Sequence, residues 1–303
     1  MSAQRGSNET WTVLKMLEWI TGYFEKQGFD SPRYEAEVLL EHALSMQRIM
    51  IYANFDRPLQ SSELDVIRPM VKRRGKYEPM AYITGSRGFW TIDLKTDARA
   101  LIPRPDTEAL VEVALEKLDA RAKERADHRV RVIDIGTGSG AIALAIAHDR
   151  EQAEVAAVDI SAPALSLARE NAEALDLSGR VTFFEADLFA GLPAEWVESL
   201  DIVVSNPPYV SRDEEEIMGK GVKAFEPEGA LFAEDDGLAI IKRLVPEAYS
   251  ALAPGGWLLC EIGFAQGSVV KEIFSNQGFV EVSVRKDLGR KDRVVLGQKP
   301  ATA

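Results

Sequence analysis

The sequence has few of the residues from which disulfides and metal centres are built. Its 303 residues include one cysteine, Cys260, so no internal disulfide and no cysteine-rich metal site can form. The three histidines, His42, His128 and His148, are far apart and lack the spacing of metal ligands. We therefore expect no bound metal. Cys260 ends the apolar stretch 257–260, which predicts a buried structural thiol rather than a nucleophile.

Positive charge is also scarce. The chain has 36 lysines and arginines against 48 acidic residues, a net charge of −12, and its isoelectric point is about 4.9. Proteins that bind nucleic acid by neutralising phosphates need clustered basic residues, so we expect no direct nucleic-acid partner. Lys72, Arg73, Arg74 and Lys76 form a local basic run. We interpret it as a solvated helix end, with a binding patch as the alternative.

Long apolar runs are missing too. No stretch approaches the roughly 18 apolar residues of a membrane span, and residues 1–8 lack the apolar core of a secretory signal. We expect a cytoplasmic protein with no membrane partner, and a monomer by default. Hydrophobic residues make up 46% of the chain, enough to bury a sizeable core. The length fits about two domains.

Residues 1–80 predict a small all-helical domain. Apolar residues recur at helical spacing from Leu14 to Phe24. Ser31-Pro32 is typical of a helix start. Pro69 lies inside a later helical pattern and predicts either a kink or a boundary.

Residues 81–101 predict a β-hairpin linker between this domain and a second one, residues 102–303. Gly85 and Gly88 punctuate the segment, and residues 89–94 are aromatic or β-branched at most positions.

From residue 130 onward, strand and helix patterns alternate. Strands are predicted at 130–135, 154–160, 181–185, 201–205, 257–262, 279–284 and 293–297, and helices at 139–148, 161–175, 237–252 and 266–276. Alternating units of this kind predict an α/β fold with a mostly parallel sheet covered on both faces. The last two strands are joined too closely for a helical crossover, so they should pair antiparallel.

The first strand of this region leads into Gly136-Thr137-Gly138-Ser139-Gly140. Glycines allow a sharp turn and leave space for a ligand, and open α/β sheets bind ligands at this end of a strand. Asp159 ends the second strand, where a carboxylate accepts the ribose hydroxyls of a nucleoside. The alternative role for Asp159 is a helix N-cap, although Ser161 can fill that position itself.

Two residues after the third strand extend this predicted nucleoside site. We expect Asp187 to approach an adenine amino group and Leu188 to cover the ring, with ordinary loop roles as the alternative. A nicotinamide dinucleotide would also suit the glycine loop and the strand-end acid. Ala141 stands at the position of the third dinucleotide glycine, and this comparison does not decide between the two cofactors.

The fourth strand ends in Asn206-Pro207-Pro208-Tyr209. The prolines stiffen the chain, so the Asn206 side chain and the Pro207 carbonyl offer two acceptors in fixed directions, and Tyr209 offers a flat face. Two such acceptors hold both hydrogens of an amide or exocyclic amine and favour turning its lone pair out of plane. A sulfonium methyl group is already electrophilic, so positioning supplies most of the barrier reduction. The alternative is a proline-rich turn without chemistry.

Together these motifs resemble the HemK/PrmC family, the S-adenosylmethionine-dependent methyltransferases of the glutamine in peptide-chain release factors. The resemblance covers nearly the whole chain, including segments 82–85, 101–108, 225–227 and 287–294. It implies a class I S-adenosylmethionine-dependent methyltransferase fold: Rossmann-like, with a mostly parallel sheet, an antiparallel C-terminal strand, a helical N-terminal domain and a linking hairpin.

The resemblance also implies an activity, protein-(glutamine-N5) methylation in translation termination. Methyl would pass from S-adenosylmethionine to the glutamine amide of the Gly-Gly-Gln motif in class 1 release factors, leaving S-adenosylhomocysteine. Residues 136–140, Asp159, Leu188 and Asn206 would contact the cofactor, residues 206–209 would hold the glutamine, and Arg104 would face the active site. Relatives often resemble one another in an aromatic at position 188, which leucine replaces here.

Other substrates stay open at this point. Asn-Pro-Pro-Tyr is shared with enzymes that methylate a ribosomal-protein glutamine or adenine N6 in DNA. The acidic charge and the short N-terminal domain disfavour DNA. Segment 101–108 resembles the release-factor group, although Asp106 or Thr107 also suits a helix cap with Glu108 in the first turn. A non-catalytic binding module is the last alternative, and both motifs speak against it.

Overall fold

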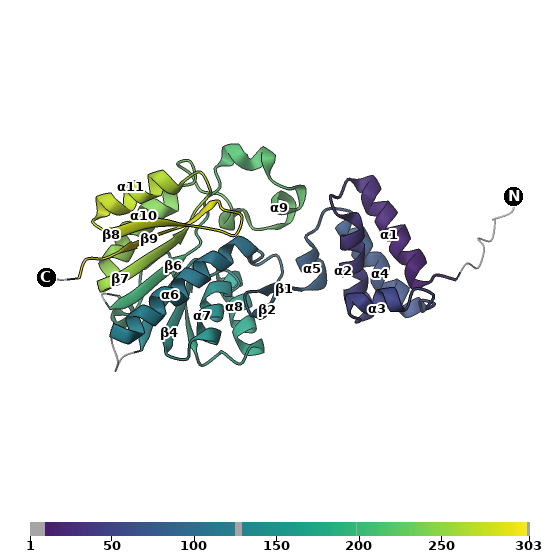
Figure 1. The fold of residues 1–303 in the computed structure, drawn as a ribbon, viewed down its shortest axis with the longest axis horizontal. Coiled ribbons are helices and arrows are strands. Elements are labelled where there is room, and N and C mark those ends of the chain that lie inside the picture. The colour runs from purple at the N-terminus through teal and green to yellow at the C-terminus, as the bar shows by residue number, and fades with distance from the viewer. Residues whose placement is uncertain (1–9, 125–128, 198, 302–303) are drawn as a thin grey trace. The chain divides into compact units, whose positions relative to one another are not determined.

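The computed structural model of this chain describes residues 10–124, 129–197 and 199–301 (Figure 1). His128 and the polar segment 1–8 lie outside the described residues. Two compact units are present: residues up to Gly85 together with Lys220–Phe225, and residues 86–219 together with 226 onward. Among the described residues, no helix is long and apolar enough to cross a membrane.

The first unit is helical. Its elements are α1 (Val13–Gln27), α2 (Pro32–Leu44), α3 (Arg48–Ala53), α4 (Ser61–Arg74), α5 (Met80–Thr84) and α9 (Lys220–Phe225). The apolar stripe of α1 packs on α2 in a buried cluster that also contains residues of α3 and α4, and Leu17, Ile20 and Phe24 are completely covered. Helix α4 continues past Pro69, so a helix boundary at this proline was a wrong alternative.

The basic run lies at the end of α4, as interpreted from the sequence. Arg73 donates to Glu78 at 2.9 Å, and Arg74 donates to Glu35 at 2.8 Å. Two of the four charges are therefore paired with acids of the same unit.

The linker hairpin is shorter than the predicted 81–101. Residues 80–84 form helix α5, and the hairpin consists of β1 (Ser86–Phe89) and β2 (Ile92–Lys95). Gly85 has φ +75° and ends α5 in the left-handed conformation. This glycine is therefore a helix C-cap, whereas the sequence interpretation placed it within the hairpin.

Residues 220–225 were predicted to belong to the second domain, and the structure groups them with the helical unit. Gly221 packs so closely on Tyr77 that a Cβ atom would lie 2.3 Å from the Tyr77 carbonyl oxygen. The Lys220 ammonium lies 4.7 Å from the centre of the Tyr77 ring. A segment distant in sequence thus completes this unit.

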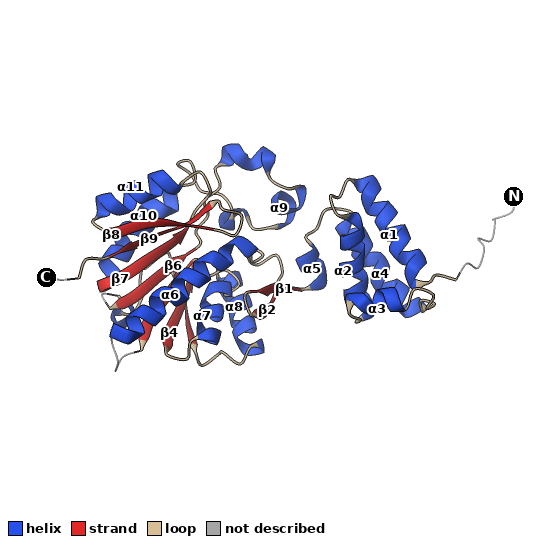
Figure 2. Ribbon diagram, viewed as in Figure 1, coloured by secondary structure: helices blue, strands red, loops and turns tan. Residues whose placement is uncertain are grey.

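The second unit contains a seven-stranded sheet in the order β5-β4-β3-β6-β7-β9-β8 (Figure 2). Its strands are β3 (Val130–Ile135), β4 (Ala153–Asp159), β5 (Val181–Glu185), β6 (Leu200–Ser205), β7 (Leu252–Glu261), β8 (Val280–Lys286) and β9 (Asp292–Gln298). β9 pairs antiparallel with both β7 and β8, as predicted for the last two strands. The predicted α/β fold with a mostly parallel sheet is confirmed.

Helices cover both faces of this sheet. They are α6 (Glu108–Glu124), α7 (Ala141–Asp149), α8 (Ala162–Ala174), α10 (Ala239–Ala251) and α11 (Gly267–Gln277). Neighbouring residues of β3 enter different cores: Val132 packs with α6 and α7, and Ile133 packs with α10 and α11. Period-two alternation with both faces buried explains the continuous apolar runs of the strands. Cys260 is buried in the second core, as predicted.

The register brings three chain segments to one edge of the sheet. Ile135 pairs with Val158 on one side and with Ser205 on the other. The Ser205 hydroxyl also donates to the Ile135 carbonyl at 2.7 Å. The glycine loop, Asp159 and Asn206 follow directly after these positions. This edge is the switch point of the strand order, where α/β sheets bind ligands.

Candidate active site

A cavity of about 400 Å³ opens at this edge of the sheet, a size typical of small-molecule sites. Most of the predicted site residues line it, namely Arg104, Gly136, Thr137, Gly138, Ser139, Asp159, Asp187, Leu188, Asn206, Pro207 and Pro208. Gly140 and Tyr209 are predicted site residues that do not line it. The apolar part of the wall includes Ile142, Ile160 and Ile240.

The glycine loop takes a shape that favours glycine. Gly136, Gly138 and Gly140 have φ values of +75°, +56° and +84°, a region that costs residues with a Cβ about 1–2 kcal/mol. A Cβ on Gly140 would also lie 3.0 Å from Leu144 and 3.2 Å from Ala168. Gly140 therefore allows α7 to begin and to pack on α8.

Hydrogen bonds within the protein hold this loop. Gly136 and Thr137 donate to the Val158 carbonyl at 2.8 and 2.9 Å, and Gly140 donates to the Thr137 carbonyl at 2.9 Å. Gly138 donates to the Asp159 carboxylate at 2.8 Å. A dinucleotide pyrophosphate needs such N–H groups pointing at the ligand. Four of the five N–H groups in this loop already donate hydrogen bonds within the protein, which favours a cofactor without phosphate.

Asp159 is fixed from two sides. Besides the bond from Gly138, its other oxygen accepts from the Ser161 N–H at 2.9 Å. Ser161 itself caps α8 by accepting from the Ala164 N–H at 3.3 Å, so Asp159 is not needed as the N-cap. Burial raises the pKa of Asp159, and the amide donors oppose that shift. A carboxylate has about four acceptor positions, which leaves capacity for ligand hydroxyls.

Asp187 and Leu188 also form part of the cavity wall. Asp187 pairs with Arg243 at 2.8 Å, and both residues line the cavity. Leu188 is buried and has φ +53°, an uncommon value for a residue other than glycine. Their adenine contacts stay predictions.

Asp134 lies beneath the glycine loop and is completely buried. One oxygen accepts from the Thr137 hydroxyl at 2.6 Å and from the Ala143 N–H at 3.3 Å. The other has no hydrogen-bond partner among the described residues. Burial raises the pKa of Asp134 to about 7, partly opposed by the Thr137 and Ala143 hydrogen bonds. The sequence signal that could have identified Asp134 is an acidic residue inside the otherwise apolar strand 130–135.

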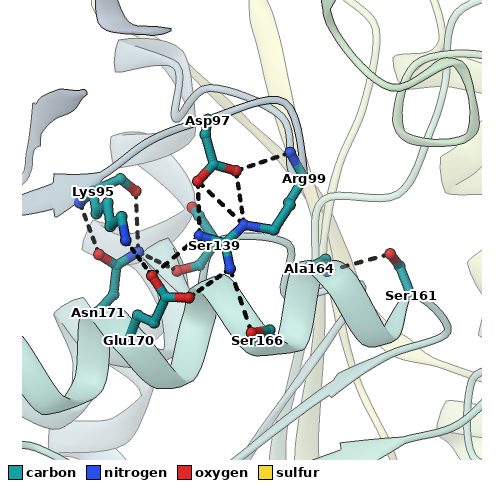
Figure 3. Close-up of polar contacts among 9 residues, drawn as sticks. All are labelled: Lys95, Asp97, Arg99, Ser139, Ser161, Ala164, Ser166, Glu170 and Asn171. Carbon is teal, nitrogen blue, oxygen red and sulfur yellow. Dashed lines mark hydrogen bonds and ion pairs between the residues drawn. The ribbon is translucent and has the colours of Figure 1, made fainter. Parts of the chain in front are cut away.

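A polar cluster joins the hairpin exit to the glycine loop (Figure 3). The buried Asn171 side chain accepts from the Lys95 N–H at 2.7 Å and donates to the Ser139 carbonyl at 2.9 Å. Arg99 lies between Asp97 and Glu170 and also lines the cavity. Helix α8 thus holds the loop and the wall together.

The Asn206–Tyr209 segment lies on the opposite side of the switch point from Asp159. The Asn206 amide nitrogen donates to the Thr107 hydroxyl at 3.2 Å. The Tyr209 carbonyl accepts from Gln266, and the Tyr209 hydroxyl donates to Glu261 at 3.3 Å. Tyr209 is thereby fixed in the protein, and its stacking on a substrate stays a prediction.

Arg104 lines the cavity and pairs with the buried Glu226 at 2.6 Å. The second Glu226 oxygen accepts from the Ile102 N–H at 3.2 Å. Glu226, Thr107 and Glu261, which contact Arg104, Asn206 and Tyr209, were not among the predicted site residues. Sequence signals for them did exist. Glu226 lies in segment 225–227 and Thr107 in segment 101–108, both of which carry the family resemblance, and Glu261 is an acidic residue at the end of an apolar strand.

Comparison with known proteins gives matches over nearly the whole chain. A family model described as the PrmC N-terminal domain matches residues 15–85, and one described as the methyltransferase small domain matches residues 111–234. A release factor glutamine methyltransferase of Rhodopirellula baltica is 42% identical over 97% of this chain and 98% of its own. One of Geobacter sulfurreducens is 41% identical over 96% of this chain and 98% of its own.

Among solved structures, the catalytic domain of human Mettl16, in complex with an RNA hairpin, is similar in fold. It aligns with a TM-score of 0.56 and 20% identity, covering 80% of this chain and 92% of its own.

The buried Asp134 predicts a pH dependence of stability. An unfolded aspartate titrates near about pH 4, whereas the folded pKa is about 7. Between these values the folded state binds a proton that the unfolded state does not, so the free energy of unfolding falls as pH rises. Urea unfolding at about pH 5 and about pH 8 should show a smaller fall for Asp134→Asn than for the wild type. Equal falls would contradict the assignment.

The polar cluster around Asn171 predicts a loss of stability when its hydrogen bonds are removed. Asn171→Leu leaves the Ser139 carbonyl and the Lys95 N–H without their partner, at about 1–3 kcal/mol for each buried group. Cofactor affinity should fall as well, because the loop loses its anchor. The matched control is Glu170→Gln, which weakens exposed ion pairs worth about 0–1 kcal/mol. Similar unfolding midpoints for both variants would refute the role of Asn171.

Proposed function

This chain belongs to the family of release factor glutamine methyltransferases, and we propose that it methylates the side-chain amide nitrogen of the Gly-Gly-Gln glutamine in class 1 release factors. Its fold is the class I S-adenosylmethionine-dependent methyltransferase fold. The observation that carries the proposal is the position of Asn206 beside the glycine loop, at the ends of two adjacent strands.

The cavity fits S-adenosylmethionine as the methyl donor. The Asp159 carboxylate suits the ribose hydroxyls, and Leu188 with Ile142 and Ile160 gives an apolar wall for adenine. The glycine loop has its N–H groups turned inward, which suits a cofactor without phosphates. When bound, this cofactor supplies an electrophilic methyl group on a sulfonium and leaves as the neutral thioether S-adenosylhomocysteine.

The protein's part in the reaction is to hold the glutamine nitrogen. Asn206 donates its amide hydrogen to Thr107, which leaves its oxygen to accept from the substrate. The Pro207 carbonyl accepts the second hydrogen. Held at both hydrogens, the nitrogen directs its lone pair at the methyl carbon. The new N–C bond forms as the S–C bond breaks, and the nitrogen then releases one proton to water. Orientation of this kind contributes roughly 7–11 kcal/mol.

The remaining residues shape the substrate side of the site. Pro208 stiffens the segment, and Tyr209 stacks on the planar amide. Arg104, held by Glu226, directs its remaining N–H groups at the backbone of the Gly-Gly-Gln loop. The Arg104–Glu226 pair as a whole carries no net charge, and Arg104 still offers N–H donors, which suits a neutral peptide.

The helical unit docks the release factor in this proposal. It exposes several large apolar side chains, namely Trp19, Tyr34, Ile49, Met50, Tyr52 and Val66. Where such side chains gather into one contiguous patch, they mark protein interaction surfaces. The enzyme would act as a monomer in the cytoplasm, where release factors work.

Labelled S-adenosylmethionine tests the proposal. We expect label on a purified release factor and none on the same factor with its Gly-Gly-Gln glutamine replaced. Equal label on both would refute the substrate assignment.

Asn206→Ala should lower kcat by roughly 100-fold or more, the scale of losing one transition-state hydrogen bond, with the cofactor Kd nearly unchanged. Asn276→Ala, at an exposed position of α11, is the matched control and should retain full activity.

A further inference from the structure

Two loops beside Tyr209 carry exposed apolar side chains that the reaction described above does not use. The first loop, residues 263–266, follows β7, and its Phe264 is 63% exposed. The second loop, residues 287–291, joins β8 to β9, and its Leu288 is completely exposed. It lies within one of the segments that carry the family resemblance. Single exposed apolar residues are ordinary in proteins, so the position of these two decides what they mean.

The first loop is fixed against Tyr209. The Gln266 side chain accepts from the Gly263 N–H at 2.9 Å and donates to the Tyr209 carbonyl at 3.1 Å. A Cβ atom on Gly263 would lie 3.5 Å from the Tyr209 ring, so the loop backbone packs directly on this ring. Phe264 is the next residue and is therefore carried at the edge of the Asn206–Tyr209 segment.

Buried charges hold the second loop. The Asp287 N–H donates to the Lys291 carbonyl at 2.9 Å, and the Lys291 N–H donates to the Asp287 carboxylate at 3.0 Å. The buried Arg293 donates to Asp287 and to Asp106, each at 3.1 Å. It also reaches the Tyr209 hydroxyl at 3.5 Å. Both loops are thus built onto the residue that follows the two prolines.

The two loops meet at Lys291, whose ammonium group lies 5.3 Å from the centre of the Phe264 ring and is attracted by it. Leu288 lies in the same tight turn as Lys291. Burial stabilises a leucine only when water is removed from it. Because Leu288 is completely exposed, its side chain adds nothing of this kind to the stability of the fold. We call Phe264 and Leu288 the apolar rim.

The proposed substrate has a segment that can cover this rim. In Gly-Gly-Gln, the two residues before the glutamine have no side chains, so the motif itself offers a single side chain for recognition. Distinguishing this glutamine from others requires contacts beyond the motif. An extended chain spans about 3.3–3.6 Å per residue. A few residues beyond a glutamine held at Tyr209 therefore reach loops that contact Tyr209.

We propose that Phe264 and Leu288 bind apolar side chains of the release factor in the chain immediately beside its Gly-Gly-Gln motif. This inference rests on the proposed function, because it takes the release factor as the substrate. The rim contacts the substrate away from the reacting atoms, and equally before and during methyl transfer. Contacts of this kind lower KM and leave kcat unchanged.

Steady-state kinetics with a release factor and labelled cofactor test the rim. Phe264→Ala and Leu288→Ala should each raise KM for the factor roughly tenfold, between an ordinary interface contact and a hot spot. Their kcat, cofactor Kd and unfolding midpoints should match the wild type, because both side chains are exposed. Leu288→Met keeps the apolar volume and should stay within about twofold of the wild-type KM.

Val280→Ala is the matched control. Val280 is another exposed apolar residue of the same unit, and it begins β8 at the end remote from the second loop. Its KM should equal that of the wild type. A wild-type KM in both rim variants, or a fall in their kcat at unchanged KM, would overturn the rim while the proposed function stands. If the wild-type enzyme puts no label on the factor, the proposed function fails and the rim fails with it.

Photo-crosslinking locates the partner of the rim. With Leu288 replaced by p-benzoylphenylalanine, crosslinks to the release factor should map to the residues that flank Gly-Gly-Gln, and the same replacement of Val280 should give none. Crosslinks confined to a remote part of the factor would overturn the proposal. Crosslinks between two copies of this chain would overturn it as well, because the rim would then be a contact between copies.

Discussion

The parallel register between β3, β4 and β6 is the constraint on which the site depends. It places the glycine loop, Asp159 and Asn206 at one edge because all three follow directly after paired positions. The Ser205 hydroxyl bond to the Ile135 carbonyl, at 2.7 Å, fixes the strand ends on the two sides of the switch point. A shift of one residue would turn these side chains to the other face. In the proposed function, this backbone pairing brings the methyl donor and the methyl acceptor together.

Around this edge, the protein fixes its polar groups by burying them. Asp134 holds the glycine loop through the Thr137 hydroxyl, and the buried Glu261 accepts from the Tyr209 hydroxyl of the Asn206–Tyr209 segment. Both acids lie at or near the end of an apolar strand, where burial penalises their charge. Buried polar groups have few alternative hydrogen-bond partners, so the hydrogen bonds that they form keep a fixed geometry. That rigidity suits a reaction whose rate depends on orientation.

Much of this was predictable from local patterns in the sequence. The glycine loop and Asn206–Tyr209 each follow an apolar strand, so their meeting at one edge follows from the α/β pattern alone. The partnership of Thr107 with Asn206 was not predictable, because no local pattern links residues 99 positions apart. Gly85 was misplaced in the hairpin because a glycine ending a helix and one opening a turn look alike in sequence. The pairing of Gly221 with Tyr77 depends on tertiary packing.

In the proposed reaction, two acceptors of this chain hold the glutamine nitrogen in line with the methyl group. A crystal structure with S-adenosylhomocysteine and a Gly-Gly-Gln peptide tests it most directly. We expect the glutamine nitrogen within hydrogen-bond distance of the Asn206 side-chain oxygen and the Pro207 carbonyl, and the thioether sulfur on the far side of the position of the methyl group. A glutamine amide bound elsewhere, or an Asn206 nitrogen facing the substrate nitrogen, would contradict it.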